Sequence, residues 1–225
     1  MSAGFLVGLT AFVALLAVLA VRDHRRAIAS RRQLLDACRG VLDEERWTAG
    51  DDGFPALEGR AYGRAVVAKL IPDTMVVRRL PQLWLSVTMK HRIPHAPSLS
   101  IIARFTGNEF YAAALDLPQR IDPPIGFPLD VMIRGDGGRA SRLCHDLAPA
   151  LAKVLTDERV KEIILAPNGV RIVRQAAEGR RGEHLLLRQA VFDDCKIQRS
   201  DFVQALSELA DLTEKRDAQL EARAA

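Results

Sequence analysis

Hydrophobic residues dominate the start of the chain, and this run differs from every later segment. Residues 3–21 read AGFLVGLTAFVALLAVLAV and contain no charged side chain. At about 1.5 Å of rise per residue, a helix of this length spans roughly 30 Å, the hydrocarbon thickness of a bilayer. Because the run offers no polar face for water to solvate, we interpret residues 1–21 as a transmembrane anchor.

The alternative for the same run is a cleaved secretory signal, since Val18 and Ala20 stand where small residues before a cleavage site are expected. A signal begins with basic residues, however, and residues 1–4 contain none. The basic residues lie on the far side of the apolar run, where they oppose translocation. This arrangement favours an anchor that stays in the chain.

A cluster of arginines follows the apolar run directly. Its five members are Arg22, Arg25, Arg26, Arg31 and Arg32. Basic residues beside a membrane helix remain on the cytoplasmic side, so the rest of the chain is predicted to be cytoplasmic. Anionic headgroups attract a basic residue at this position by about 1 kcal/mol. We therefore predict that the five arginines bind an anionic bilayer surface, and that the protein crosses a bacterial inner membrane once.

A helical pattern of apolar residues continues over residues 22–48. The apolar positions of this seam are Ile28, Leu35, Cys38 and Leu42. Two heptads are too few to define a coiled coil, so we expect a basic juxtamembrane helix that packs on the domain below, with self-association as the alternative. Within the anchor, Gly4 and Gly8 have the spacing that lets two helices approach closely, which predicts a homodimer as an alternative to a monomer.

Alternating apolar and polar positions indicate strands in the next part of the chain. Turn-forming residues at 49–53 end the helical pattern, and residues 49–198 are predicted to form one α+β domain. The clearest alternation covers residues 83–90 and predicts a half-buried strand. Other predicted strands cover residues 57–71 as a hairpin about Tyr62 and Gly63, 99–105, 128–134, 160–174 as a hairpin about Asn168 and Gly169, and 185–192. Residues 106–127 are expected to be a loop, with a short helix or strand near 110–115.

Two segments change to the helical period. Residues 142–155 place leucines on one stripe and predict an amphipathic helix that tolerates Pro149 near its start. In residues 199–225, Asp201 followed by Gln204 has the spacing of an N-terminal cap, and the helix is expected to fray after Glu214. The sum is an α+β fold with a mainly antiparallel sheet of about seven strands and two amphipathic helices, rather than a doubly wound parallel sheet.

The order of elements over residues 129–174 is strand, glycine-rich turn, leucine-rich helix, strand, Asn168-Gly169 and strand. This order resembles domains of uncharacterised bacterial proteins that are anchored by a single membrane helix. The resemblance covers about a fifth of the chain and implies a membrane-anchored domain, with no activity attached to it.

The net charge of +4 lies entirely in the juxtamembrane segment, because six arginines at positions 22–39 stand against Asp23 and Asp36 and the remainder of the chain is neutral. This placement indicates lipid headgroups, and it argues against a broad nucleic-acid-binding surface. The three cysteines Cys38, Cys144 and Cys195 form no C-x-x-C pair. They are typical of a reducing compartment and offer neither a disulfide framework nor a zinc knuckle.

Reactive side chains are scattered. His91 and His95 are four residues apart, but Pro94 lies between them and predicts a loop rather than a helix that presents two imidazoles to one metal. Cys144 and His145 are neighbours on a predicted helix and point about 100° apart, so they do not form a nucleophile and base pair. We therefore predict no catalytic residue, metal or cofactor.

Arginines outside the juxtamembrane segment form two further groups. Those on or near strands, Arg78, Arg79, Arg104, Arg134 and Arg174, are expected to face solvent, and they would make a site for an acidic partner only if several shared one face of the sheet. Arg139 and Arg142, with Ser141, lie near a helix start and could hold an anion, the alternative being a plain turn and cap.

These patterns predict a membrane-anchored cytoplasmic binding or scaffold module whose partners are the anionic bilayer and another protein. One alternative is a domain that binds a small ligand or a lipid. The second alternative is an enzyme of unrecognised type that uses His91, His95, Cys144 and His145.

Overall fold

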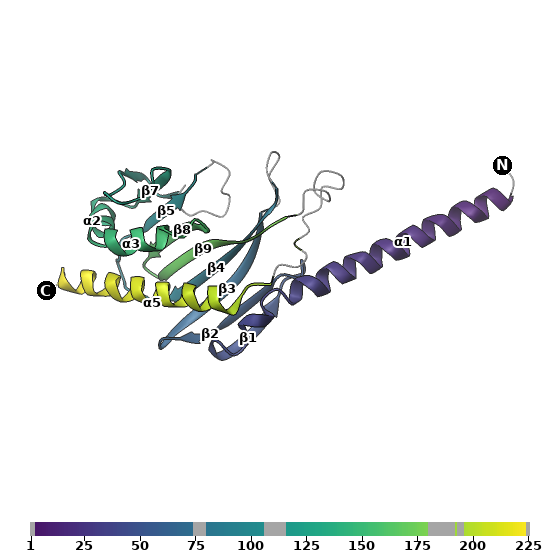
Figure 1. The fold of residues 1–225 in the computed structure, drawn as a ribbon, viewed down its shortest axis with the longest axis horizontal. Helices are drawn as coiled ribbons and strands as arrows, with labels where there is room; N and C mark the ends of the chain where they lie inside the picture. The colour runs from purple at the N-terminus through teal and green to yellow at the C-terminus, as the bar shows by residue number, and fades with distance from the viewer. Residues whose placement is uncertain (1–2, 74–79, 106–115, 180–191, 193–195, 224–225) are drawn as a thin grey trace.

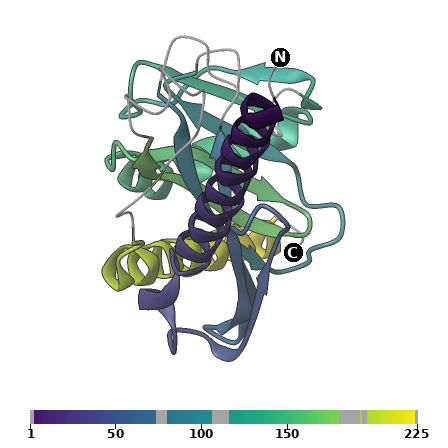
Figure 2. The same ribbon diagram turned by 90° about the vertical axis from the view of Figure 1, so that its right-hand side faces the viewer.

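The computed structural model describes residues 3–73, 80–105, 116–179, 192 and 196–223. A long helix, α1 (Ala3–Arg32), leads out of a domain built on one twisted sheet, and the two ends of the chain lie at opposite ends of the molecule (Figure 1). Seen from the α1 side, the helix projects from the domain toward the viewer (Figure 2). The apolar part of α1 therefore lies outside the domain core.

Nine strands form one sheet in the described part of the chain, in the order β1-β2-β3-β4-β9-β8-β5-β7-β6, and all neighbouring strands are antiparallel. Their bounds are β1 (Asp43–Ala49), β2 (Pro55–Ala61), β3 (Arg64–Asp73), β4 (Gln82–Lys90), β5 (Leu99–Ala103), β6 (Gln119–Ile121), β7 (Val131–Gly135), β8 (Val160–Ala166) and β9 (Gly169–Glu178). The α+β class and the antiparallel sheet are confirmed. The predicted number of about seven strands is wrong.

Both predicted hairpins are present. Strands β2 and β3 pair from Ala61 and Arg64 outward, and the two turn residues Tyr62 and Gly63 have φ angles of 51° and 71°. Positive φ at both central positions matches the right-handed twist of the flanking strands. Strands β8 and β9 pair from Ala166 and Gly169 outward. Local turn chemistry therefore fixes these two registers.

Strand β4 is more buried than its alternating sequence predicts. Leu85, Val87 and Met89 are buried on the face toward helix α5 (Arg199–Ala222), where the Thr213 hydroxyl lies 3.7 Å from the Met89 sulfur. On the opposite face Ser86 is only 1% exposed. The strand lies between β3 and β9 in the sheet and is covered on both faces, so the predicted half-buried strand is corrected to a buried one.

The predicted helix over residues 142–155 is instead two helices, α2 (Gly138–Asp146) and α3 (Ala148–Leu155). They meet at Leu147, directly before Ala148 and Pro149. Proline has no N–H to donate to the preceding turn and its ring crowds the carbonyl four residues earlier, so one continuous helix is broken here. Proline is accommodated in the first turn of α3, where the N–H groups have no helical acceptor.

Helix α5 continues to Ala222 and does not end near Glu214, which corrects the predicted fraying. Arg216 is completely buried and donates hydrogen bonds to the backbone oxygens of Ala166 and His91, at 3.0 and 3.3 Å. These bonds attach the C-terminal half of α5 to the ends of two strands. The predicted capping pair is also wrong, because the helix starts after Gln198 without a side-chain cap.

The predicted juxtamembrane helix over residues 22–48 ends at Arg32. A short 3-10 helix, η1 (Asp36–Cys38), follows, and residues 43–49 are the edge strand β1. Pairing of Trp47 with Leu57 and of Thr48 with Ala56 ties this segment into the sheet, so tertiary pairing overrides its helical pattern. The sheet thus begins before residue 49, and Leu35, Cys38 and Leu42 belong to its core.

Two predicted elements fall on residues outside the described part of the chain. These are the short helix or strand near residues 110–115 and, except for the buried Phe192, the strand over residues 185–192.

Candidate membrane-surface site

Helix α1 contains the one segment of the described residues that is long and apolar enough to cross a membrane. The window that meets this test has a mean hydropathy of 1.6, and none of it is buried against the domain. Large apolar side chains such as Phe5 and Val18 are 58% and 64% exposed. An unburied apolar surface of this extent is unfavourable in water, because each exposed Å² costs about 25 cal/mol.

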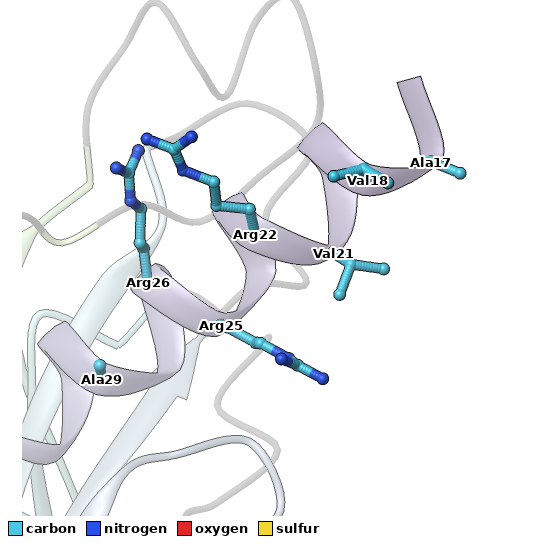
Figure 3. Close-up of a pocket in the computed structure, with 7 residues that line it drawn as sticks. All are labelled: Ala17, Val18, Val21, Arg22, Arg25, Arg26 and Ala29. Carbon is cyan, nitrogen blue, oxygen red and sulfur yellow. The ribbon is translucent and has the colours of Figure 1, made fainter. Parts of the chain in front are cut away.

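Arginines replace the apolar side chains where this segment ends. Figure 3 shows Arg22 and Arg26 extending from one side of α1 and Arg25 from the other. Together with Ala17, Val18, Val21 and Ala29 they line a hollow of about 590 Å³. The guanidinium of Arg26 is 3.9 Å from the carboxylate of Asp23, and both side chains are largely exposed. The hollow therefore joins an apolar surface to a cationic one along a single helix.

A second hollow, of about 620 Å³, continues along α1 toward the domain. Arg25 and Ala29 line both hollows, and Arg32 and Arg39 belong to the second. Arg39 donates to the Asp36 carboxylate at 2.9 Å and stacks over the Trp47 ring at 4.1 Å. We use the term arginine collar for Arg22, Arg25, Arg26 and Arg32, which are all exposed.

Arg31 differs from the other four arginines because it points to the domain. Its guanidinium donates to the backbone oxygen of Asp52 at 2.9 Å and lies 5.0 Å from the centre of the Phe54 ring. This contact fastens α1 to the turn between β1 and β2. The sequence predicted the same membrane-surface role for Arg31 as for the other four arginines. Position along the chain does not reveal which arginine faces the protein.

The helix base is also held by apolar contacts. Leu34 and Leu35, which follow α1, are 4% and 0% exposed and belong to the main core. Phe54 packs edge to face on Phe192, with ring centres 6.3 Å apart. Helix α1 thus ends in the protein core, and the domain follows the collar without a free linker.

The candidate reactive residues are not assembled into one site. Cys144 is buried, and burial raises the pKa of its thiol to about 12, so the thiol stays protonated at neutral pH. His145 is exposed, and its Nδ1 is 2.8 Å from the Ser141 oxygen of the same helix. His95 is an exposed turn residue with a φ of 62°. The described residues contain no group of three side chains that could hold a metal ion.

His91 belongs to an ion-pair cluster that joins β3 to α5. Arg64 Nε donates to His91 Nδ1 at 3.2 Å, and His91 Nε2 lies 3.4 Å from the Asp217 carboxylate. Arg64 and Arg216 both pair with the same carboxylate, at 3.3 and 3.0 Å. Through these contacts the His91 imidazole helps to attach α5 to β3.

The arginines on strands do not share one face. Arg174 is buried under α5, where it pairs with Glu208 at 2.6 Å and Asp157 at 3.6 Å. Arg104 donates to the Val160 oxygen at 3.0 Å and is half-buried, which corrects its predicted outward position. Arg134 pairs across the sheet with Ser100 and donates to the Pro118 oxygen at 3.5 Å. Arg78 and Arg79 lie outside the described residues, and the other three arginines do not form the shared face that an acidic-partner site would need.

The sequence did not reveal a largely buried polar cluster of three residues on the face of the sheet opposite α5. Glu162 is 0% exposed, accepts a hydrogen bond from the Ser100 hydroxyl at 2.8 Å and lies 3.4 Å from the Arg171 guanidinium. The apolar run in which Glu162 lies indicated only a buried strand. The acidic residue inside that run was the one sign of a buried polar contact, and it does not identify Ser100 or Arg171 as the partner.

No family model matches the chain, and no curated protein matches it. Among solved structures, the chain is similar to the crystal structure of the mycobacterial trehalose monomycolate transport factor A, TtfA. The two share 9% sequence identity with a TM-score of 0.43, over 84% of this chain and 96% of that chain.

Proposed function

We propose that the protein is a single-pass membrane protein that holds an α+β binding module against the cytoplasmic face of a bacterial inner membrane. The observation that carries this proposal is the unburied apolar half of α1, which passes into the arginine collar and then into the core without a linker. Burial in a bilayer would remove the apolar half of α1 from water, and anionic headgroups would attract the arginine collar. The base of α1 packs on the domain.

Distance along α1 places the domain next to the lipid. From Val21, the last apolar residue before the collar, to Ile28, whose backbone contacts the domain at Gly53, the helix advances about 10 Å. This length slightly exceeds the headgroup region on one side of a bilayer, which is about 5 to 8 Å thick. The module is therefore held at the membrane surface, where it binds its partner close to the lipid.

The charge of the collar supports both the orientation and the lipid contact. Arg22, Arg25 and Arg26 lie within about one and a half turns of the end of the apolar segment. Each contributes about 1 kcal/mol of attraction to anionic headgroups and opposes transfer of the domain across the membrane. The sum favours a cytoplasmic domain and a preference for anionic lipid.

Membrane insertion of the full chain in inverted bacterial membrane vesicles tests this proposal. After insertion the protein should resist extraction by alkaline carbonate, and added protease should digest the exposed domain. In the triple variant Arg22→Gln, Arg25→Gln and Arg26→Gln we expect a smaller fraction of chains with a digestible domain. The control variant Arg60→Gln, Arg92→Gln and Arg120→Gln removes the same charge from exposed positions distant in sequence from the anchor. Extraction of the unchanged chain by carbonate, or an N-terminus cleaved near Val21, would show that the apolar segment is not an anchor.

A further inference from the structure

A hollow of about 490 Å³ lies at the end of the domain opposite the anchor. It is lined by Pro97, Arg139, Arg142, Leu143, Leu220 and Arg223. The lining residues come from α2, from the end of α5 and from the segment before β5, which meet at the far end of the molecule from α1 (Figure 1). The collar and this hollow are therefore separate features, and neither depends on the other.

The charges around the hollow are only partly neutralised. Arg223 forms an ion pair with Asp146. The nearby Asp136 carboxylate accepts a hydrogen bond from the Ser98 amide at 2.7 Å. Arg139 and Arg142 are exposed and form no hydrogen bond or ion pair with another described residue. Two guanidinium groups thus line the hollow without a counter-charge from any residue that the structure describes.

The position of these two arginines is electrostatically unfavourable in the protein alone. Arg139 lies in the first turn of α2, and no acidic residue is present in that turn. The N-terminal end of a helix carries a partial positive charge, which favours anions and disfavours cations. Arg142 follows three residues later on the same side of the helix. An anion in the hollow would relieve the repulsion that both side chains experience.

Apart from the three arginines, the lining is apolar. Leu143 is 2% exposed and forms a buried part of the wall, and Pro97 is also buried. A volume of about 490 Å³ falls in the range of small-molecule pockets, roughly 300 to 1,000 Å³. A guanidinium group matches the oxygens of a phosphate with two parallel N–H donors.

We infer that this hollow is a binding site for a small organic phosphate, with the phosphate held by Arg139 and Arg142 and the apolar part of the ligand against Leu143 and Leu220. The site is distinct from the membrane-surface site. It gives the module a soluble ligand that it binds away from the bilayer.

Calorimetric titration of the full chain in a neutral detergent tests the inference. The probes are phenyl phosphate, which has an apolar ring, and inorganic phosphate, which has none. We expect phenyl phosphate to bind with one-to-one stoichiometry and at least fivefold more tightly than inorganic phosphate. The double variant Arg139→Gln and Arg142→Gln should weaken binding of phenyl phosphate at least tenfold. Because both residues are exposed, the variant should retain the melting temperature of the unchanged protein.

The matched control is Arg46→Gln with Arg60→Gln, which removes the same charge from β1 and β2 at the other edge of the sheet. It should bind phenyl phosphate as the unchanged protein does. Absence of saturable binding, equal weakening in both double variants, or equal affinity for the two probes would each overturn the inference. So would a polyglutamate peptide that displaces phenyl phosphate at a lower concentration than inorganic phosphate requires, since that result identifies an acidic protein segment as the ligand.

Discussion

Gly53 lies so close to Ile28 that a β-carbon at position 53 would be 3.0 Å from the Ile28 Cγ2 atom and 3.1 Å from its backbone oxygen. The contact joins the turn between β1 and β2 to the base of α1. Gly53 also has a φ of +80°, a conformation that other residues adopt at a cost. Together with the hydrogen bond from Arg31 to the Asp52 backbone oxygen, this contact fixes the direction in which α1 leaves the domain.

Substitution Gly53→Ala should therefore destabilise the protein more than substitution Gly63→Ala. Both positions have positive φ, at +80° and +71°, and each alanine costs about 1 to 2 kcal/mol of backbone strain. Only position 53 lacks space for the new methyl group, which adds about 1 to 3 kcal/mol, whereas position 63 is open. Urea unfolding of both variants in detergent micelles measures the difference. Equal losses of stability would mean that Gly53 is not in close contact with Ile28 of α1.

Local signals account for the parts of the fold that the sequence predicted correctly. The turn at Tyr62 and Gly63 and the turn before Gly169 each depend on residues inside the turn, so their hairpins could be identified without knowing the rest of the structure. The apolar run before Arg22 likewise needs no partner to be recognised. The arginine collar could be predicted for the same reason.

Contacts between distant residues account for the errors. Strand β1 has a helix-like sequence and becomes a strand only because Trp47 pairs with Leu57 of β2. The end of α5 looks polar, but Arg216 binds the carbonyl of Ala166, fifty positions away in the sequence. The inward direction of Arg31 depends on Asp52 in the same way. Neither the partner nor the direction of such a side chain is encoded in its immediate neighbours.

We predict that the folded protein loses stability in acid when the carboxylate of Asp157 is protonated. Burial alone would raise the pKa of this carboxyl, but hydrogen bonds from the Arg159 amide and guanidinium, and the charge of Arg174, outweigh burial and hold the pKa below its usual range. A carboxyl with a lowered pKa in the folded state stabilises the protein above its unfolded pKa of about 3.9. That contribution disappears as the pH falls below about 4 through the folded pKa.

Urea unfolding of the unchanged protein and of Asp157→Asn between pH 7 and pH 2.5 measures this contribution. The variant should be less stable at neutral pH, and the two free energies of unfolding should converge as the pH falls below about 4. Arg174 remains paired with Glu208 in the variant, so the fold itself should persist. A difference that stays constant across this range would show that the charge of Asp157 is not the source of the stabilisation.

We predict that the two buried cysteines do not react with thiol reagents while the protein is folded. Burial raises the pKa of the Cys144 thiol to about 12 and that of Cys38 to about 11. Only the thiolate reacts readily, so neither residue should react with a thiol reagent at pH 8. The test uses the variant Cys195→Ser, because Cys195 lies outside the described residues. No thiol should react in detergent micelles, and two should react after addition of urea. Rapid modification of Cys144 before unfolding would restore it as a candidate nucleophile.

Leu85 and Leu129 provide a matched test of the core, because they are the same residue in opposite surroundings. Leu85 is 1% exposed on the central strand β4, between Leu70 of β3 and Arg174 of β9, and Leu129 is fully exposed in the loop before β7. Leu85→Ala removes buried methyl groups and leaves a cavity, which should reduce the free energy of unfolding by about 2 to 5 kcal/mol. Leu129→Ala should change it by less than about 0.5 kcal/mol. Urea unfolding followed by tryptophan fluorescence measures both, since Trp84 and Trp47 lie in or beside the same sheet. A loss at Leu85 no greater than the loss at Leu129 would place the stabilising core away from the face of the sheet that α5 covers.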